Sequence, residues 1–326
     1  MGLLLSLFFG FVPVFFFSWF IYWIDRYEKE PLRLLGLVFF WGAIIAAGGA
    51  WLINTILGVG VYLFTGSETA ANITTGSLIA PVVEESLKGL AVLIIFLRYR
   101  YEFDSILDGI IYAAITGLGF AAIENTFYIY SFGYLENGLE GLFTLAFVRV
   151  VMVGWQHAFY TAFIGIGLAV ARLNLKILVK ILAPVAGWSM AIFAHSFHNT
   201  MADLLPAPFN LVGTLIDWSG WILILLVILW TLYQERLNLI RYLNDEVKAD
   251  TISPAQYRTA CSARAVSMAR LSSLFSGRYH NTSMFYQLCG ELAHKRNQVA
   301  RLGDEGGNNA TIQRIRQELA RLSPHL

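Results

Sequence analysis

The sequence predicts an all-α membrane protein: a polytopic bundle of about seven transmembrane helices, followed by a small cytoplasmic helical tail. The chain has 326 residues, of which 57% are hydrophobic and only 14% are charged. Its mean hydropathy is +0.59, well above that of a soluble domain. The apolar residues form blocks of about 20 or more, the length that an α-helix needs to cross a bilayer. This composition indicates an integral membrane protein.

Seven segments satisfy the length rule: residues 3–24, 34–60, 76–97, 105–130, 143–170, 177–201 and 211–233. The first has no basic region or small-residue cleavage site, so we expect a retained helix and not a signal peptide. From residue 236 the chain is polar and rich in helix-forming residues. We therefore expect a membrane domain over residues 1–235 and a cytoplasmic helical tail over residues 236–326.

Two features of the tail allow a prediction. Ile312, Ile315, Leu319 and Leu322 recur at helical spacing, and residues 303–309 separate them from an earlier apolar series. This pattern predicts a small helical hairpin. Cys261 and Cys289 have no metal-type spacing and are expected to be reduced thiols.

Lysine and arginine predict the orientation. They occur in the first, third and fifth connections and throughout the tail, whereas the second, fourth and sixth connections contain none. The positive-inside rule therefore predicts an outside N-terminus and a cytoplasmic C-terminus.

Ionisable residues interrupt four of the predicted spans. Each costs roughly 2.5 to 3.5 kcal/mol at the centre of a spanning helix, so such residues indicate a functional site. They include Glu84, Glu85 and Lys88 in the third span, Glu124 in the fourth, Arg149 and His157 in the fifth, and His195 and His198 in the sixth. Asp217, near the outer end of the seventh span, is expected to be interfacial.

Helical rise places several of these groups at a common depth. At 1.5 Å of rise per residue, Glu84 lies about 12 Å below the outer end of its span, and Glu124 and His195 lie about 9 Å below the outer ends of theirs. His157 comes out deeper, about 21 Å from the start of the span 143–170, or about 15 Å if the helix enters the bilayer near residue 147. A shared depth favours one site over several independent structural uses.

Each group also has a structural interpretation. Lys88 is spaced to pair with Glu84 or Glu85, but a single ammonium leaves one carboxylate in excess. Arg149 can either extend to the interface or pair with a carboxylate. His195, which shares a helix face with Asn199, can act as an interhelical hydrogen-bond partner.

The ordered motifs resemble those of the PrsW intramembrane proteases, distant relatives of the CAAX-processing endopeptidases. The matching features are Glu84-Glu85-x-x-Lys88, Gly119 to Asn125 with Glu124 and the following Tyr128, His157 with Gly165-x-Gly167, and His195-x-x-x-Asn199. The segment Tyr27 to Pro31 matches more weakly. The resemblance covers roughly residues 20 to 230 and not the tail, and the additional His198 leaves open which imidazole acts.

The resemblance implies hydrolysis of a peptide bond within or beside the bacterial cytoplasmic membrane, with membrane-spanning proteins such as anti-sigma factors as substrates. The catalytic candidates are Glu84, Glu85, Glu124, His157, His195 and Asn199, supported by Lys88, Asn125, Arg149 and His198. In a metal mechanism, His157, His195 and Glu124 hold Zn²⁺ and another glutamate is the general base. In a metal-free mechanism, a glutamate takes the proton from water, and histidine with Asn199 stabilises the oxyanion.

Two other functions fit the same residues. An ion- or proton-coupled transporter could use the carboxylates and histidines as a relay. A non-catalytic scaffold could use them only to hold helices together. We expect no nucleic-acid partner, nucleotide or organic cofactor, because no phosphate loop, dinucleotide fingerprint or nucleic-acid module is present. Lateral access for a substrate helix would distinguish a protease from a transporter.

Overall fold

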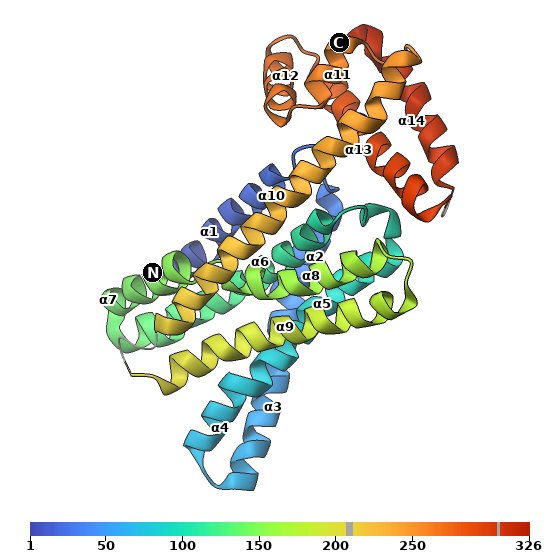
Figure 1. Cartoon of the computed structure of the whole chain (residues 1–326). Coiled ribbons are helices and arrows are strands. Elements are labelled where there is room, and N and C mark those ends of the chain that lie inside the picture. The colour runs from blue at the N-terminus through green and yellow to red at the C-terminus, as the bar shows by residue number, and fades with distance from the viewer. Residues whose placement is uncertain (207–210, 305–306) are drawn as a thin grey trace. The chain divides into compact units, whose positions relative to one another are not determined.

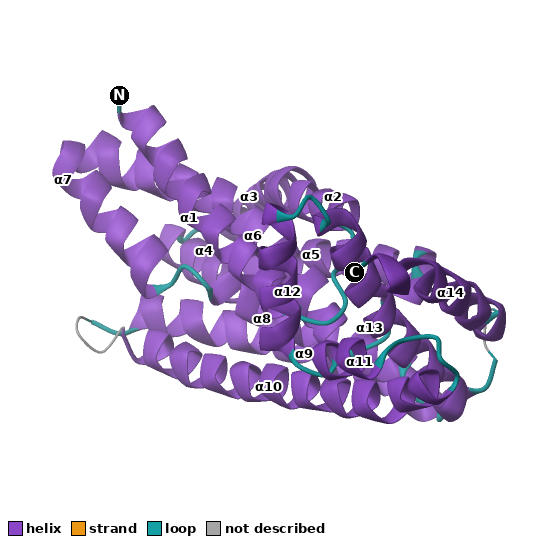
Figure 2. Cartoon of the chain, turned by 90° about the horizontal axis from the view of Figure 1, so that it is seen from above, coloured by secondary structure: helices purple, strands orange, loops and turns teal. Residues whose placement is uncertain are grey.

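A computed structural model describes residues 1–206, 211–304 and 307–326. All regular elements in these residues are helices (Figures 1 and 2). Five stretches are long and apolar enough to span a membrane: Gly2–Ile24, Leu32–Thr65, Ile106–Arg172, Ile177–Leu204 and Leu211–Lys248. The helical membrane class is therefore confirmed, whereas the number of seven spans and the orientation stay predictions. The predicted third span misses this set because Glu84, Glu85 and Lys88 lie in it.

The chain divides into two compact units. The first comprises residues 1–22, 31–172 and 176–225. Its elements are α1 (Gly2–Ile24), α2 (Leu32–Phe40), η1 (Trp41–Ala46), α3 (Ala47–Thr65), α4 (Glu68–Thr74), η2 (Thr75–Ile79), α5 (Ala80–Arg98), η3 (Arg100–Glu102), α6 (Ile106–Tyr128), η4 (Ile129–Tyr134), α7 (Leu135–Ala146), η5 (Phe147–Met152), α8 (Gln156–Arg172), α9 (Ile177–Leu204) and the first part of α10 (Leu211–Lys248).

The centre of the first unit is formed by α6, α8 and α9. Ser105 caps the N-terminus of α6, and its side chain accepts a hydrogen bond from the Asp108 main chain in a capping box. Gly109 of α6 faces Gly165 of α8 so closely that a Cβ on either glycine would overlap the other's carbonyl oxygen. Small residues of this kind let membrane helices approach each other. Gly117 of α6 lies equally close to the main chain of His157 at the start of α8.

The expected continuous helix over residues 143–170 is wrong. The helical segment that ends with η5 stops at Met152, and Val153 has a non-helical backbone (φ −122°, ψ 8°). Gly154, a weak helix former, follows it, and α8 begins at Gln156. His157 therefore lies in the first turn of α8, not about 21 or 15 Å along a continuous helix.

A helical hairpin of α3 and α4 precedes α5 (Figure 1). Gly66 ends α3 with φ 65°, a left-handed conformation that glycine adopts without strain. Ser67 then caps α4 by accepting a hydrogen bond from Ala70 N at 3.2 Å. The π-helical η2 continues from α4 into α5, and this continuity fixes the approach of the hairpin to the candidate site.

The second unit comprises residues 23–30, 173–175 and 226–326. Its helices are the last part of α10, α11 (Pro254–Ala260), α12 (Ala263–Phe275), α13 (Tyr279–Leu302) and α14 (Asn308–Leu322), followed by η6 (Ser323–His325). The expected hairpin is present as α13 and α14, although residues 305–306 of its turn lie outside the described residues. The division into domains at residue 235 stays a prediction.

The core of the second unit includes a loop from the N-terminal part of the chain. Tyr27 is buried in it together with Phe285 and Leu319. The side chain of Gln287 binds the main chain of Lys29 twice, accepting from its nitrogen at 2.8 Å and donating to its oxygen at 3.0 Å. Both cysteines are free and buried here, as expected for reduced thiols. The tail is thus packed around the segment that joins α1 to α2.

Candidate active site

Helix α5 places three ionisable groups on one buried face. Pro81 stands in its first turn. Glu84 is 6% exposed, and Glu85 and Lys88 are fully buried. The Lys88 ammonium lies 2.6 Å from Glu85 Oε1 and 3.7 Å from Glu84 Oε2. Lysine thus pairs mainly with Glu85, which leaves Glu84 as the carboxylate in excess.

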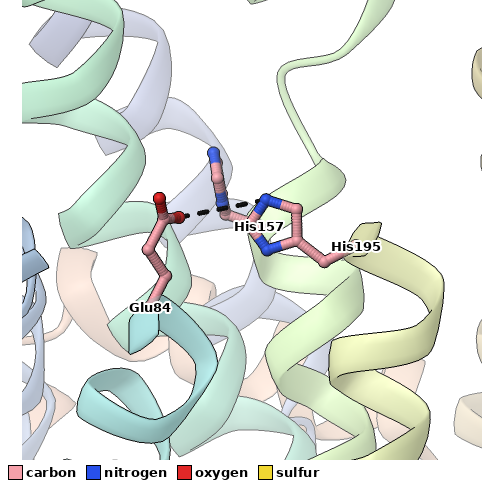
Figure 3. A group of neighbouring side chains, drawn as sticks. All are labelled: Glu84, His157 and His195. Carbon is pink, nitrogen blue, oxygen red and sulfur yellow. Dashed lines mark ion pairs between the residues drawn. The ribbon is translucent and has the colours of Figure 1, made fainter. Parts of the chain in front are cut away.

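His195 of α9 is oriented by the paired glutamate. Its Nδ1 lies 2.9 Å from Glu85 Oε1, and Thr161 donates to Glu85 Oε2 at 2.9 Å. With Nδ1 engaged, the other nitrogen of His195 points toward Glu84, and Nε2 is 3.9 Å from Glu84 Oε2 (Figure 3). A carboxylate behind a histidine fixes the ring and its tautomer in many metal sites.

His157 is held between a cation and a carboxylate. Its Nδ1 lies 3.2 Å from the Lys88 ammonium, and its Nε2 lies 2.7 Å from Glu124 Oε2. Because an ammonium only donates, Nδ1 must accept, and a neutral imidazole then donates from Nε2 to Glu124. Gly117 of α6 permits this position, since a Cβ there would overlap the His157 main chain.

Glu84, His157 and His195 form a compact group of possible metal ligands. Each offers one ligand atom, and these atoms lie within 4.8 Å of one another (Figure 3). Glu84 Oε2 is buried yet takes part in no hydrogen bond. Two imidazoles and one carboxylate are a ligand set that suits catalytic zinc, so the residues fit a metal. The carboxylate of this group is Glu84, whereas the sequence analysis expected Glu124.

Glu124 instead belongs to an adjoining pair with Arg149. The guanidinium forms an ion pair with Glu124, donates from Nε to Asn125 Oδ1 at 2.8 Å, and lies 4.3 Å from the ring centre of Tyr128. Of the two interpretations of Arg149, the structure shows carboxylate pairing. Arg149, Asn125 and Tyr128 thus hold Glu124 beside His157.

The two remaining candidate residues of α9 have different partners. Asn199 donates to the main-chain oxygen of Gly76 in η2 at 2.9 Å. His198 Nδ1 lies 2.8 Å from Asp217 Oδ2 and 2.8 Å from the Gln156 amide nitrogen. The structure therefore places His195, and not His198, beside Glu84.

Asp217 is a buried anchor that the sequence analysis missed. It is 2% exposed, and its expected position at the membrane interface stays a prediction. Its Oδ2 accepts from the Tyr160 hydroxyl at 2.7 Å and from Gln156 Nε2 at 2.5 Å. Gln156 and Tyr160 are one turn apart on α8, and this pair of polar side chains beside His157 was the available signal.

A cavity of about 800 Å³ adjoins the candidate site. Its walls come from α3, α4, η2, α5 and α6, and the side chains of Glu84 and Glu124 both line it. Two carboxylates from different helices thus face a space large enough for part of a peptide chain.

Comparison with known proteins places the chain in a family. The model of the PrsW family of intramembrane metalloproteases matches residues 30–232. The chain is 29% identical to protease PrsW of Geobacillus kaustophilus over 48% of this chain and 62% of that protein. It is 26% identical to protease PrsW of Bacillus subtilis over 65% of this chain and 84% of that protein. It is 34% identical to protease PrsW of Clostridioides difficile over 34% of this chain and 46% of that protein. No solved structure matches significantly.

The matched region contains all the motifs that carried the resemblance except the start of the Tyr27 segment, and the tail lies outside it. The predicted resemblance is confirmed: the chain belongs to the PrsW family of intramembrane metalloproteases, a family of peptidases.

Proposed function

We propose that this protein hydrolyses a peptide bond of a membrane-spanning protein at the group formed by Glu84, His157 and His195. The observation that carries the proposal is the approach of their ligand atoms to within 4.8 Å, next to a cavity lined by two carboxylates. Membership of a peptidase family favours hydrolysis over transport or a scaffold role.

A zinc ion would be held by Glu84, His157 and His195, and it would supply a water of lowered pKa and a Lewis acid for the carbonyl. Glu85 would keep the His195 ring oriented through Nδ1. Both ring nitrogens of His157 are engaged, Nδ1 by the Lys88 ammonium and Nε2 by Glu124, so His157 could hold a metal only in exchange for one of these two contacts.

The other residues have separable roles in this proposal. Glu124 is the general base, because its carboxylate faces the cavity beside His157. Arg149 keeps that carboxylate in place. Asn199 is a positioning residue, because it ties α9 to the main chain of η2 just before α5.

A metal-free variant of the mechanism is favoured by one observation. The Lys88 ammonium lies 3.7 Å from Glu84 and 3.2 Å from His157. A fixed cation among the ligands opposes a second cation in a medium of low dielectric constant. In this variant Glu84 itself takes the proton from water.

The expected orientation places the chemistry in the outer half of the membrane. By the positive-inside rule, the connections without lysine or arginine face the outside. The substrate would then be cut near the extracytoplasmic end of its spanning segment, and anti-sigma factors are one substrate class of this kind. Such a protein would reside in the bacterial cytoplasmic membrane with its C-terminus in the cytoplasm.

The test is cleavage of a library of single-span peptides by the purified full-length protein in liposomes. Glu84→Gln removes the charge but keeps the shape, and should abolish cleavage while the protein remains folded. Glu140→Gln, at an exposed glutamate, is the matched control and should cut at the wild-type rate. Mass spectrometry of the new termini locates the cut. Normal turnover by Glu84→Gln would refute the site.

A further inference from the structure

We infer that the outward face of α12, in the tail, lies on the membrane surface and binds anionic phospholipid. Helix α12 belongs to the second unit, which supplies none of the candidate catalytic residues, so this lipid binding is a property separate from hydrolysis. In the expected orientation the membrane surface concerned is that of the cytoplasmic leaflet.

The face of α12 that points away from the tail core is apolar. Val266 and Ser273 of this helix are buried, whereas Met268, Leu271 and Phe275 are 57%, 51% and 89% exposed. The exposed residues follow one another at spacings of three and four, so they share one side of the helix, opposite to Val266 and Ser273. A surface helix in water has polar residues on its outer side. An apolar outer side is typical of a contact with a membrane or with another protein.

The charge around this face favours a membrane. Residues 251–290 include four arginines and no aspartate or glutamate. Arg264 lies one turn before Met268 on the same side of α12, and Arg278 follows the end of the helix; both are exposed. Anionic lipids of the cytoplasmic leaflet attract basic segments that lie next to a spanning helix. An apolar face with arginines beside it is the pattern of a helix that lies in the membrane interface.

A contact with the end of α1 sets the level of α12. Helix α1 is long and apolar enough to span a membrane, and Trp23 stands in its last turn. The guanidinium of Arg26 lies 3.3 Å from the ring centre of Trp23 and donates to the Ser267 hydroxyl of α12 at 3.4 Å. Tryptophan and arginine are typical of the boundary between a bilayer and the cytoplasm. Helix α12 is therefore attached where the chain leaves the bilayer.

A second copy of the chain is a poorer partner for the same face. Two copies that met symmetrically through α12 would bring Arg264 and Arg278 of one copy close to the same residues of the other. Like charges at such a contact repel each other. Anionic headgroups instead bring the opposite charge, and the acyl region below them accepts apolar side chains.

Photocrosslinking of the full-length protein tests the position of α12. The protein carries p-benzoylphenylalanine in place of Phe275 and is reconstituted into vesicles of equimolar phosphatidylglycerol and phosphatidylcholine. The control carries the same group in place of Gln317, an exposed residue on α14. Mass spectrometry should find at least fivefold more lipid adducts at position 275 than at position 317. Equal yields at the two positions, or adducts of position 275 to a second copy of the chain in place of lipid, would overturn the inference.

The composition of the adducts at position 275 tests the role of charge. Phosphatidylglycerol should be enriched at least twofold over its share of the vesicle lipid. Replacing Arg264 and Arg278 together by Gln should abolish this enrichment. The same double change at Arg301 and Arg314, which are exposed on α13 and α14, should preserve it. Adducts of the wild-type arginine pair that match the vesicle composition would overturn the binding of anionic lipid.

The apolar side chains are tested in the same assay. Replacing Met268 and Leu271 together by Gln should lower the yield of lipid adducts at position 275 at least threefold. It should not lower the melting temperature in detergent, because both side chains are exposed. Ser272→Gln, at an exposed serine of the same helix, should leave the yield within twofold. An unchanged yield in the Met268 and Leu271 variant would overturn the role of the apolar face. None of these measurements requires a peptide to be cut, so they stand apart from the proposed hydrolysis.

Discussion

The ring of Tyr160 stacks on the imidazole of His195, with ring centres 4.7 Å apart and an angle of 15° between the planes. The same tyrosine donates its hydroxyl to buried Asp217 at 2.7 Å. Asp217 on α10 is thereby connected, through one side chain, to a candidate ligand on α9. The stack fixes the plane of the His195 ring, and the contact of Nδ1 with Glu85 fixes the rotation of the ring in that plane. Two independent contacts therefore define the ring position.

Asp217 is predicted to be a positioning residue. Asp217→Ala would leave the Tyr160 hydroxyl and the Gln156 amide without their acceptor, at a cost of about 1–3 kcal/mol in stability. Tyr160→Phe keeps the stacked ring and should lower kcat less than tenfold with KM unchanged. Asp217→Asn, which keeps the shape and an acceptor oxygen, should recover most of the stability. Thermal unfolding measures the loss of stability, and steady-state cleavage measures kcat and KM. A change of KM alone in Tyr160→Phe would contradict the positioning role.

His195 and His198 are predicted to differ in importance. His195→Ala should reduce turnover at least a hundredfold, because it removes a group 3.9 Å from Glu84 that a catalytic metal would need. His198→Ala should reduce turnover less than tenfold, since His198 contacts Asp217 and Gln156 instead. The reverse order in a cleavage assay would mean that the wrong imidazole has been assigned.

The pair of Lys88 and Glu85 is predicted to stabilise the fold as a unit. Both side chains are fully buried and 2.6 Å apart, so Lys88→Met leaves an uncompensated carboxylate and should cost about 3–5 kcal/mol. Adding Glu85→Gln should restore part of that loss. A double-mutant cycle of chemical unfolding measures the coupling, and simple additivity of the two changes would show that the pair is not coupled.

The tail cysteines are predicted to be unreactive in the folded protein. Burial raises the pKa of the Cys289 thiol, and it also raises the pKa of Cys261. Because the thiolate is the reactive form, alkylation by iodoacetamide should be slow in native protein and fast after denaturation. Fast alkylation of native Cys289 would contradict its burial.

The same pKa shift gives a pH dependence with a definite sign. The free energy of unfolding should be insensitive to Cys289 below about pH 8.5, the ordinary thiol range. Above it, unfolded chains lose a proton that the folded protein retains, so stability falls as pH rises. Cys289→Ala should weaken this decline.

Much of the site was predictable because its residues are chemically exceptional in their surroundings. A carboxylate or imidazole in an apolar helix is visible in a sequence, and helical spacing already indicated that Lys88 can reach Glu84 or Glu85. Sequence could not rank these pairings, because the choice of Glu85 depends on Thr161 and His195 from two other helices. The sequence also could not show that Glu84, and not Glu124, lies with His157 and His195, because this grouping depends on the packing of three helices.

Two features of the structure are not visible in the local sequence. Residues 143–170 are continuous in hydropathy, but one helix ends at Met152, where Val153 has a non-helical backbone, and the next begins at Gln156. The burial of Asp217 depends on partners that lie 57 and 61 residues earlier in the chain. Likewise, no local pattern foretells that Gln287 binds Lys29, 258 residues away.

Metal content, measured together with peptide cleavage in the same preparations, tests the central claim most directly. Wild-type protein is predicted to carry about one Zn²⁺ per chain, and Glu84→Gln, His157→Ala and His195→Ala should each lose both the metal and cleavage. His198→Ala should keep the metal and most of the activity. Stoichiometric metal in all three ligand variants would contradict the site, and an active wild type without metal would replace the zinc mechanism by the glutamate one.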